Sequence, residues 1–194
     1  MYIMETENKI VRLFIEEAHP KTIREIAKNI YADYKITHTA VQRLLKAKIL
    51  LFETVGKSTL CKRNPAYYGI AIYEAENERR ESMLKNANLK QLYKEIMQKI
   101  GTSLFVCLLF GSYAKGNQTK ASDIDLLFVI NNKDAEEKIT RILSLLPLKT
   151  HALVFTEEEF IRMKDTKKTN VIQEAIGKNT ILYGIEAYYR LKNA

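Results

Sequence analysis

Two hydrophobic patterns divide the chain. Through residue 100, apolar positions mostly recur every three or four residues, the spacing of one face of an α-helix. Leu104 to Phe110 are then seven consecutive apolar residues, the pattern of a strand buried on both faces. The chain is therefore predicted to have an α+β fold, with a mainly helical first part and a sheet in the second.

Two helices open the first part. Residues 5–18 place their apolar side chains on one face, and this helix ends at His19-Pro20, because the residue before a proline is disfavoured in the α conformation. Thr22, followed three residues later by Glu25, has the capping-box pattern that begins a second helix.

Thr37 or Thr39 is predicted to begin a third helix, and residues 49–65 form two β-rich runs that turn at Gly56. Three short helices followed by a hairpin resemble a winged helix-turn-helix domain, here residues 1–65. Such a domain would place its third helix in the DNA major groove and its hairpin on phosphates. The residues concerned are Thr37, His38, Thr39, Gln42, Arg43 and Lys46 of the helix, and Lys57, Lys62 and Arg63 in or beside the hairpin. A solvated polar surface and a protein-interaction module are the alternatives.

The remainder is predicted as a helical linker over residues 66–87 and a second domain over 88–194, a mixed sheet with helices. Its helices are expected at 89–100, ending at Gly101-Thr102, at 134–146, after Glu157 and in the tail, and its strands at 104–110, 123–130, 150–155 and 180–183.

Composition and charge narrow the class of protein. The 194 residues are 46% hydrophobic and 28% charged, as in a globular protein with a core. No apolar run approaches the length of about 20 residues that crosses a membrane. There is no secretory signal pattern, and Cys61 and Cys107 lack metal-ligand spacing, so a reducing cytoplasm is expected. Of the net charge of +8, residues 1–65 carry +5 (12 basic, 7 acidic), which favours either phosphate binding or a lysine-rich solvated surface.

Two short groups in the second part carry chemistry. Gly111 permits a tight turn from strand to helix, where the Ser112 hydroxyl, free backbone N–H groups and Lys115 can hold phosphate oxygens. Asp123 and Asp125 are two residues apart on the next strand, so their side chains project from one face. Neighbouring carboxylates repel each other unless a cation lies between them, and their hard oxygens suit Mg²⁺. If the two strands are neighbours, this equipment suits phosphoryl or nucleotidyl transfer.

These groups resemble the polymerase-β-like nucleotidyltransferase superfamily, above all its minimal members. The resemblance covers residues 89–187 and rests on LFGSYAKG at 109–116, SDIDLL at 122–127 and ILYG at 181–184. It implies a small mixed sheet with helices on one side. It also implies that Gly111 and Ser112 contact a nucleoside triphosphate, that Asp123 and Asp125 bind Mg²⁺, and that a nucleoside monophosphate is transferred to a hydroxyl.

One family feature is missing. A third acid usually lies on a later strand, here residues 150–155, whose one titratable side chain is His151. His151 either substitutes as a base or is an ordinary strand residue. Three functions therefore stay open: an enzyme served by a nucleic-acid-binding domain, a DNA-binding regulator with a degenerate transferase domain, and an antitoxin-like partner protein. The helix at 66–85 and the symmetry of half-site recognition favour a homodimer.

Overall fold

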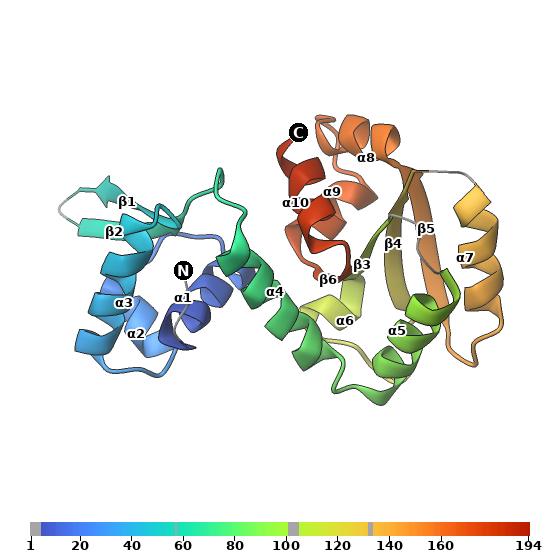
Figure 1. The fold of residues 1–194 in the computed structure, drawn as a ribbon, viewed down its shortest axis with the longest axis horizontal. Helices are drawn as coiled ribbons and strands as arrows, with labels where there is room; N and C mark the ends of the chain where they lie inside the picture. The colour runs from blue at the N-terminus through green and yellow to red at the C-terminus, as the bar shows by residue number, and fades with distance from the viewer. Residues whose placement is uncertain (1–4, 57, 101–104, 132–133) are drawn as a thin grey trace. The chain divides into compact units, whose positions relative to one another are not determined.

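The computed structural model describes residues 5–56, 58–100, 105–131 and 134–194 (Figure 1). The chain divides into two compact units, Met1–Glu78 and Arg79–Ala194. The division falls inside helix α4, Ile70–Met83, within the segment expected to link two domains. Each unit buries apolar side chains of its own.

Three helices and a hairpin form the first unit, as the hydrophobic spacing predicts. The helices are α1 Glu5–Glu16, α2 Ile23–Asn29 and α3 Tyr34–Lys46, and the antiparallel strands are β1 Leu50–Val55 and β2 Ser58–Arg63. The core contains Ile10, Phe14, Ile26, Val41 and Leu44, among other side chains. The Lys21 amide donates to the Cys61 carbonyl at 2.9 Å, and the Cys61 amide donates back at 2.7 Å. The segment before α2 thus extends the hairpin by one short antiparallel bridge.

Residues close in the sequence determine where α2 begins and where α1 ends. Thr22 and Glu25 form the predicted capping box: the Thr22 amide donates to the Glu25 carboxylate at 2.7 Å, and the Glu25 amide donates to the Thr22 hydroxyl at 3.2 Å. Helix α1 ends at Glu16, earlier than predicted, and Ala18 is exposed because the chain has already left the helix before Pro20.

The predicted start of the third helix is wrong. Helix α3 begins at Tyr34, and Asp33 is its N-cap, with a carboxylate oxygen that accepts from the Lys35 amide at 2.7 Å. An aspartate at this position satisfies free N–H groups of the first turn, so no threonine is needed as a cap. Thr37 instead lies inside the helix, fully buried, and its hydroxyl donates to the Asp33 carbonyl at 2.8 Å.

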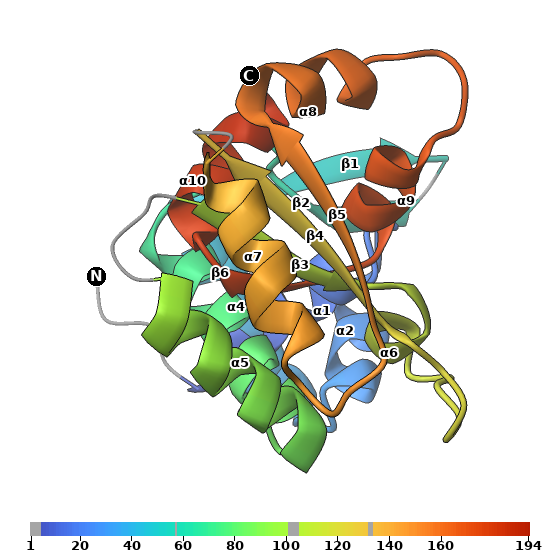
Figure 2. The same cartoon turned by 90° about the vertical axis from the view of Figure 1, so that its right-hand side faces the viewer.

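The second unit contains a sheet and its covering helices (Figure 2). The strands are β3 Phe105–Phe110, β4 Ile124–Ile130, β5 Thr150–Thr156 and β6 Thr180–Tyr183. The helices after α4 are α5 Ala87–Ile100, α6 Gly111–Lys115, α7 Asp134–Ser144, α8 Glu157–Lys164, α9 Val171–Gly177 and α10 Ile185–Asn193. The predicted helix end at Gly101-Thr102 and the predicted strand residue Leu104 lie outside the described residues. Within the described ranges, no helix combines the length and the apolar character that crossing a membrane requires.

The sheet is mixed, as expected. Its strand order is β5-β4-β3-β6, with β3 antiparallel to β4 and to β6, and with β4 parallel to β5. In the β3–β4 register, Phe110 at the end of β3 pairs with Asp125 near the start of β4. The strand that carries the Gly-Ser turn is therefore the direct neighbour of the strand that carries an aspartate of the motif.

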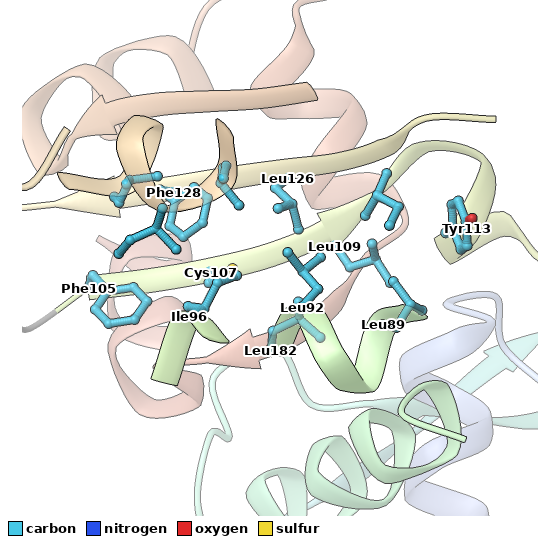
Figure 3. Packing of buried hydrophobic residues seen from close by; sticks show 14 of the residues in the cluster. Leu89, Leu92, Ile96, Phe105, Cys107, Leu109, Tyr113, Leu126, Phe128 and Leu182 are labelled. Carbon is cyan, nitrogen blue, oxygen red and sulfur yellow. The ribbon is translucent and has the colours of Figure 1, made fainter. Parts of the chain in front are cut away.

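Helices cover both faces of the sheet, so the one-sided arrangement implied by the family resemblance is wrong. Figure 3 shows one face, where Leu92 and Ile96 of α5 pack against Cys107 of β3. The alternate residues of β3, such as Leu108, point the other way and are equally buried, because α8, α9 and α10 contact the strands from that side. The run of seven apolar residues predicted this two-sided burial.

The ILYG segment has a packing role. Gly184 follows β6 with φ +78° and is the N-cap residue of α10. A Cβ atom there would lie 2.5 Å from the Phe105 carbonyl oxygen and 3.2 Å from the Val106 Cα. Only glycine combines this backbone conformation with so close an approach to β3.

Candidate functional site

The turn after β3 has the geometry that the sequence predicts. Gly111 begins the short helix α6 in the left-handed region, with φ +65°, and Gly116 ends it with φ +73°. Tyr113 of α6 is buried in the sheet's core, whereas Ser112 is only partly buried. The core therefore fixes the turn and leaves its serine accessible.

Asp125 lies directly against this turn. A Cβ atom added to Gly111 would meet the Asp125 carboxylate, 2.9 Å from its Cγ and closer to Oδ2. The Asp125 side chain is 27% exposed, so its carboxylate is partly sheltered and still open to a ligand. The condition that the two strands are neighbours is met, because β3 pairs directly with β4.

Asp123 precedes the strand that was expected to contain it. Strand β4 begins at Ile124, and Asp123 is exposed at the end of the preceding loop. That loop is closed by hydrogen bonds between Thr119 and Ser122: the Thr119 amide donates to the Ser122 hydroxyl at 2.9 Å, and the Ser122 amide donates to the Thr119 carbonyl at 3.1 Å. The hydrophobic pattern of the sequence gives no sign of this small closure, although Ser and Thr at such spacing commonly form it.

Among the described residues, no three or more His, Cys, Asp or Glu side chains come together as a metal cage. The pair of aspartates nevertheless suits Mg²⁺, which usually takes one or two carboxylates and completes its shell with water and substrate phosphates. The sheltered Asp125 carboxylate lies directly beside the Gly111 turn.

His151 stands beside Asp125 in the sheet. Strand β5 pairs with β4 in parallel so that His151 is opposite Asp125, and its Nδ1 atom lies 3.4 Å from Asp125 Oδ1. The imidazole is 59% exposed. The sequence pointed to His151 only because it is the one titratable residue of the strand where the third acid was expected. Glu159, as expected for a helix-start acid, completes a capping box with Thr156 at the start of α8.

Lys115 has a protein partner. Its ammonium group lies 2.8 Å from a carboxylate oxygen of Glu174 on α9, and both side chains are close to half-exposed. The sequence singled out Lys115 for phosphate contact but gave no sign of this ion pair, because the two residues are 59 positions apart. An exposed pair of this kind contributes little to stability.

In the first unit, the residues predicted to face DNA divide into groups. His38, Thr39, Gln42, Arg43 and Lys46 are exposed on α3, whereas Thr37 is buried, so its predicted contact with a groove is wrong. Because α3 begins earlier than predicted, Tyr34 and Lys35 also belong to this helix, and both are exposed. Arg43 Nη1 also lies 3.4 Å from the buried Glu7 carboxylate.

The hairpin presents fewer free cations than its sequence suggests. Gly56 forms the turn with φ +61°, and Lys57 lies outside the described residues. Lys62 forms an ion pair with Glu53 across the two strands at 2.8 Å, and Arg63 donates to the Asn64 carbonyl at 3.5 Å. Both cations are half-buried.

The second unit combines a mixed sheet with a Gly-Ser turn that is held against an acidic strand, and this combination defines a nucleotidyltransferase-type domain. The family described as "Polymerase beta, Nucleotidyltransferase" matches residues 90–187, about half of the chain. The chain belongs to this family.

Two curated relatives come from Methanocaldococcus jannaschii. The protein named "Putative protein adenylyltransferase MJ1305" is 42% identical over 52 residues, which are 27% of this chain and 35% of that protein. The chain thus spans about a third of that relative's length. The protein named "Putative protein adenylyltransferase MJ0141" is 32% identical over 101 residues, which are 50% of this chain and 93% of that protein. No solved structure matches the chain.

Proposed function

We propose that the second unit transfers a nucleoside monophosphate, with AMP as the first candidate, from a nucleoside triphosphate to a hydroxyl group of a protein. The observation that carries this proposal is the pairing of Phe110 with Asp125, which holds the carboxylate against the Gly111 turn. Family membership supports nucleotidyl transfer. The names of the two relatives support adenylate as the group and a protein as the acceptor.

The residues would act in three roles. Gly111 and the Ser112 hydroxyl would bind the triphosphate through its oxygens, and Lys115 would leave Glu174 to add a positive charge. Asp123 and Asp125 would hold Mg²⁺, which when bound supplies positive charge to the phosphates. The acceptor hydroxyl loses its proton to solvent, its oxygen forms a bond to the α-phosphorus, and pyrophosphate leaves with the bonding electrons of the broken P–O bond.

The first unit is proposed to be a winged helix-turn-helix domain that binds DNA, with residues 1–65 as the domain and residues 66–87 as its link to residues 88–194. Its support is the order of α1, α2, α3 and a hairpin, the bridge between Lys21 and Cys61, and the cations exposed on α3. A two-fold symmetric DNA site would require a homodimer, which we include in the proposal.

Transfer is tested with α-labelled ATP, CTP, GTP and UTP, Mg²⁺, and protein, RNA and small hydroxyl acceptors. We expect label from one nucleotide on a protein acceptor, and we expect Asp125→Asn to lower the rate about 100-fold, because it removes a carboxylate that would hold Mg²⁺. The matched control is Lys120→Ala, an exposed loop residue with no expected effect. Absence of transfer with every acceptor, or transfer that survives Asp125→Asn, would refute the proposal.

A second candidate is a DNA-binding regulator whose transferase unit is inactive. One observation favours it: His151, and not an acid, stands beside Asp125. Because both candidates include DNA binding, the transfer assay separates them, and a gel shift with genomic fragments tests the DNA binding itself. The regulator predicts a preferred DNA site, weakened by Gln42→Ala on α3 and unchanged by Gln91→Ala, an exposed glutamine of α5, together with no transfer. DNA binding that shows no sequence preference would exclude it.

A further inference from the structure

A groove in the second unit lies where the end of α4 meets α5. Its volume is about 710 Å³. It is lined by Glu81, Leu84 and Lys85 on the α4 side and by Lys90, Tyr93, Lys94, Met97 and Gln98 of α5. Only the short segment 84–86 joins the two helices, so the groove runs along one side of a helical hairpin. None of these residues belongs to the nucleotide site proposed above.

The floor of the groove is apolar. Helix α5 turns Leu89, Leu92 and Ile96 onto the sheet, where all three are buried. Tyr93 and Met97 each follow one of these residues by one position, so they form a second stripe on the flank of the helix, one turn apart. Both are only partly buried. The described residues thus leave an apolar stripe that a further element can cover.

The rim is positive. Lys85, Lys90 and Lys94 are exposed, and their ammonium groups form no ion pair with any residue in the described ranges, whereas Glu81 is the one acid of the lining. The Arg80 guanidinium adds a fourth positive charge, 5.6 Å from the centre of the Tyr93 ring. Its buried Nε atom forms an ion pair with the Glu81 carboxylate at 3.6 Å, without a hydrogen bond. Three lysines without an ion pair in the described ranges, around an apolar floor, complement a surface that is apolar in the middle and acidic at its edges.

We infer that this groove docks an acidic amphipathic helix of the acceptor protein, an inference that rests on the proposed function. A groove beside two helices accepts a third helix through ridges-into-grooves packing, and Met97 is a side chain that adapts to such a partner. Single-stranded nucleic acid fits less well, because it needs an open aromatic face and Arg80 lies over the Tyr93 ring. Leu89, at the start of α5, lies at the Tyr113 end of the core, so the groove begins near α6 (Figure 3). A helix bound here would bring its own protein close to the Gly-Ser turn.

The test measures binding of fluorescent probes to the full chain by anisotropy. The first probe is a synthetic peptide with leucine at helical spacing and glutamate elsewhere, and the second is a scrambled peptide of the same composition. The third is a single-stranded RNA oligonucleotide. We expect the amphipathic peptide to bind best and Lys90→Glu/Lys94→Glu to weaken it about tenfold through lost attraction and new repulsion. Met97→Gln should weaken the same peptide without a change of charge.

The control variant is Lys138→Glu/Arg141→Glu, which makes the same charge change around a separate hollow lined by α7 residues and Lys99. The inference is overturned if this control weakens the peptide equally, if the scrambled peptide binds as well, or if the oligonucleotide is the probe that depends on Lys90 and Lys94. ATP binding by the groove variants should match the wild type. Peptide binding with no transfer would refute only the proposed function, and transfer indifferent to the groove would refute only the docking site.

Discussion

Replacing Gly111 by alanine tests the geometry on which the site depends. Alanine in the left-handed conformation costs about 1 kcal/mol. The new methyl group would also lie 2.9 Å from Asp125 Cγ. Forcing such a contact in a packed site costs a further 1–3 kcal/mol, roughly. We therefore expect Gly111→Ala to destabilise the second unit by about 2–4 kcal/mol and to displace the Asp125 carboxylate.

Gly116 supplies the matched control, because it ends the same short helix with φ +73° and an added Cβ would meet no atom of the other described residues within 4 Å. Gly116→Ala should cost only the conformational part, about 1 kcal/mol. The difference between the two variants isolates the contact with Asp125.

Two measurements read out this difference. The chain contains no tryptophan and divides into two units, so a single fluorescence melt would mix their transitions. Hydrogen exchange of the β3 and β4 amides reports the free energy of opening of the second unit alone. Binding of a fluorescent ATP analogue reports the site. Equal destabilisation by the two alanines, or ATP binding that Gly111→Ala leaves unchanged, would refute the reasoning.

Three further predictions concern other parts of the molecule. Asp33→Ala removes the N-cap of α3 and should lower the stability of the first unit by about 1 kcal/mol, seen as faster hydrogen exchange in α3. His151→Asp would place a third carboxylate beside Asp125, and we expect a rise in transfer rate of about tenfold, measured with labelled ATP; no rise would show that the missing acid does not limit the reaction. Burial raises the pKa of the Cys61 thiol to about 11 and raises that of Cys107 as well. Because the pKa of the Cys61 thiol is higher in the folded than in the unfolded chain, the protonated thiol stabilises the fold below about pH 8.5, and this contribution is lost as the pH rises toward 11. The free energy of unfolding should therefore fall less between pH 8 and pH 10 in Cys61→Ala than in the wild type.

Local signals predicted much of the fold. The Thr22–Glu25 capping box depends on atoms three residues apart, and the burial of β3 follows from its unbroken apolar run. The start of α3 was misplaced because several cap residues compete within seven positions, and the carboxylate of Asp33 prevails over the hydroxyls of Thr37 and Thr39.

The site was predictable only in its parts. The sequence located Gly111 and Asp125, but their contact depends on which strands pair and in which register. The position of His151 beside Asp125 likewise follows from the parallel pairing of β4 and β5, which joins residues 26 positions apart. The spacing of apolar residues reports only on neighbours a few positions apart, so it cannot predict contacts between residues so distant in the sequence.

The ion pair of Lys115 with Glu174 affects which anions the turn would prefer. A lysine that is already paired with a carboxylate has little net attraction for a monovalent anion. Such an anion would only replace the Glu174 carboxylate by another single negative charge. A triphosphate carries several charges within a few ångströms and can outcompete the carboxylate. Glu174 would then favour ligands of high charge density. Its removal should raise the affinity of the turn for anions in general and lower its selectivity for the triphosphate.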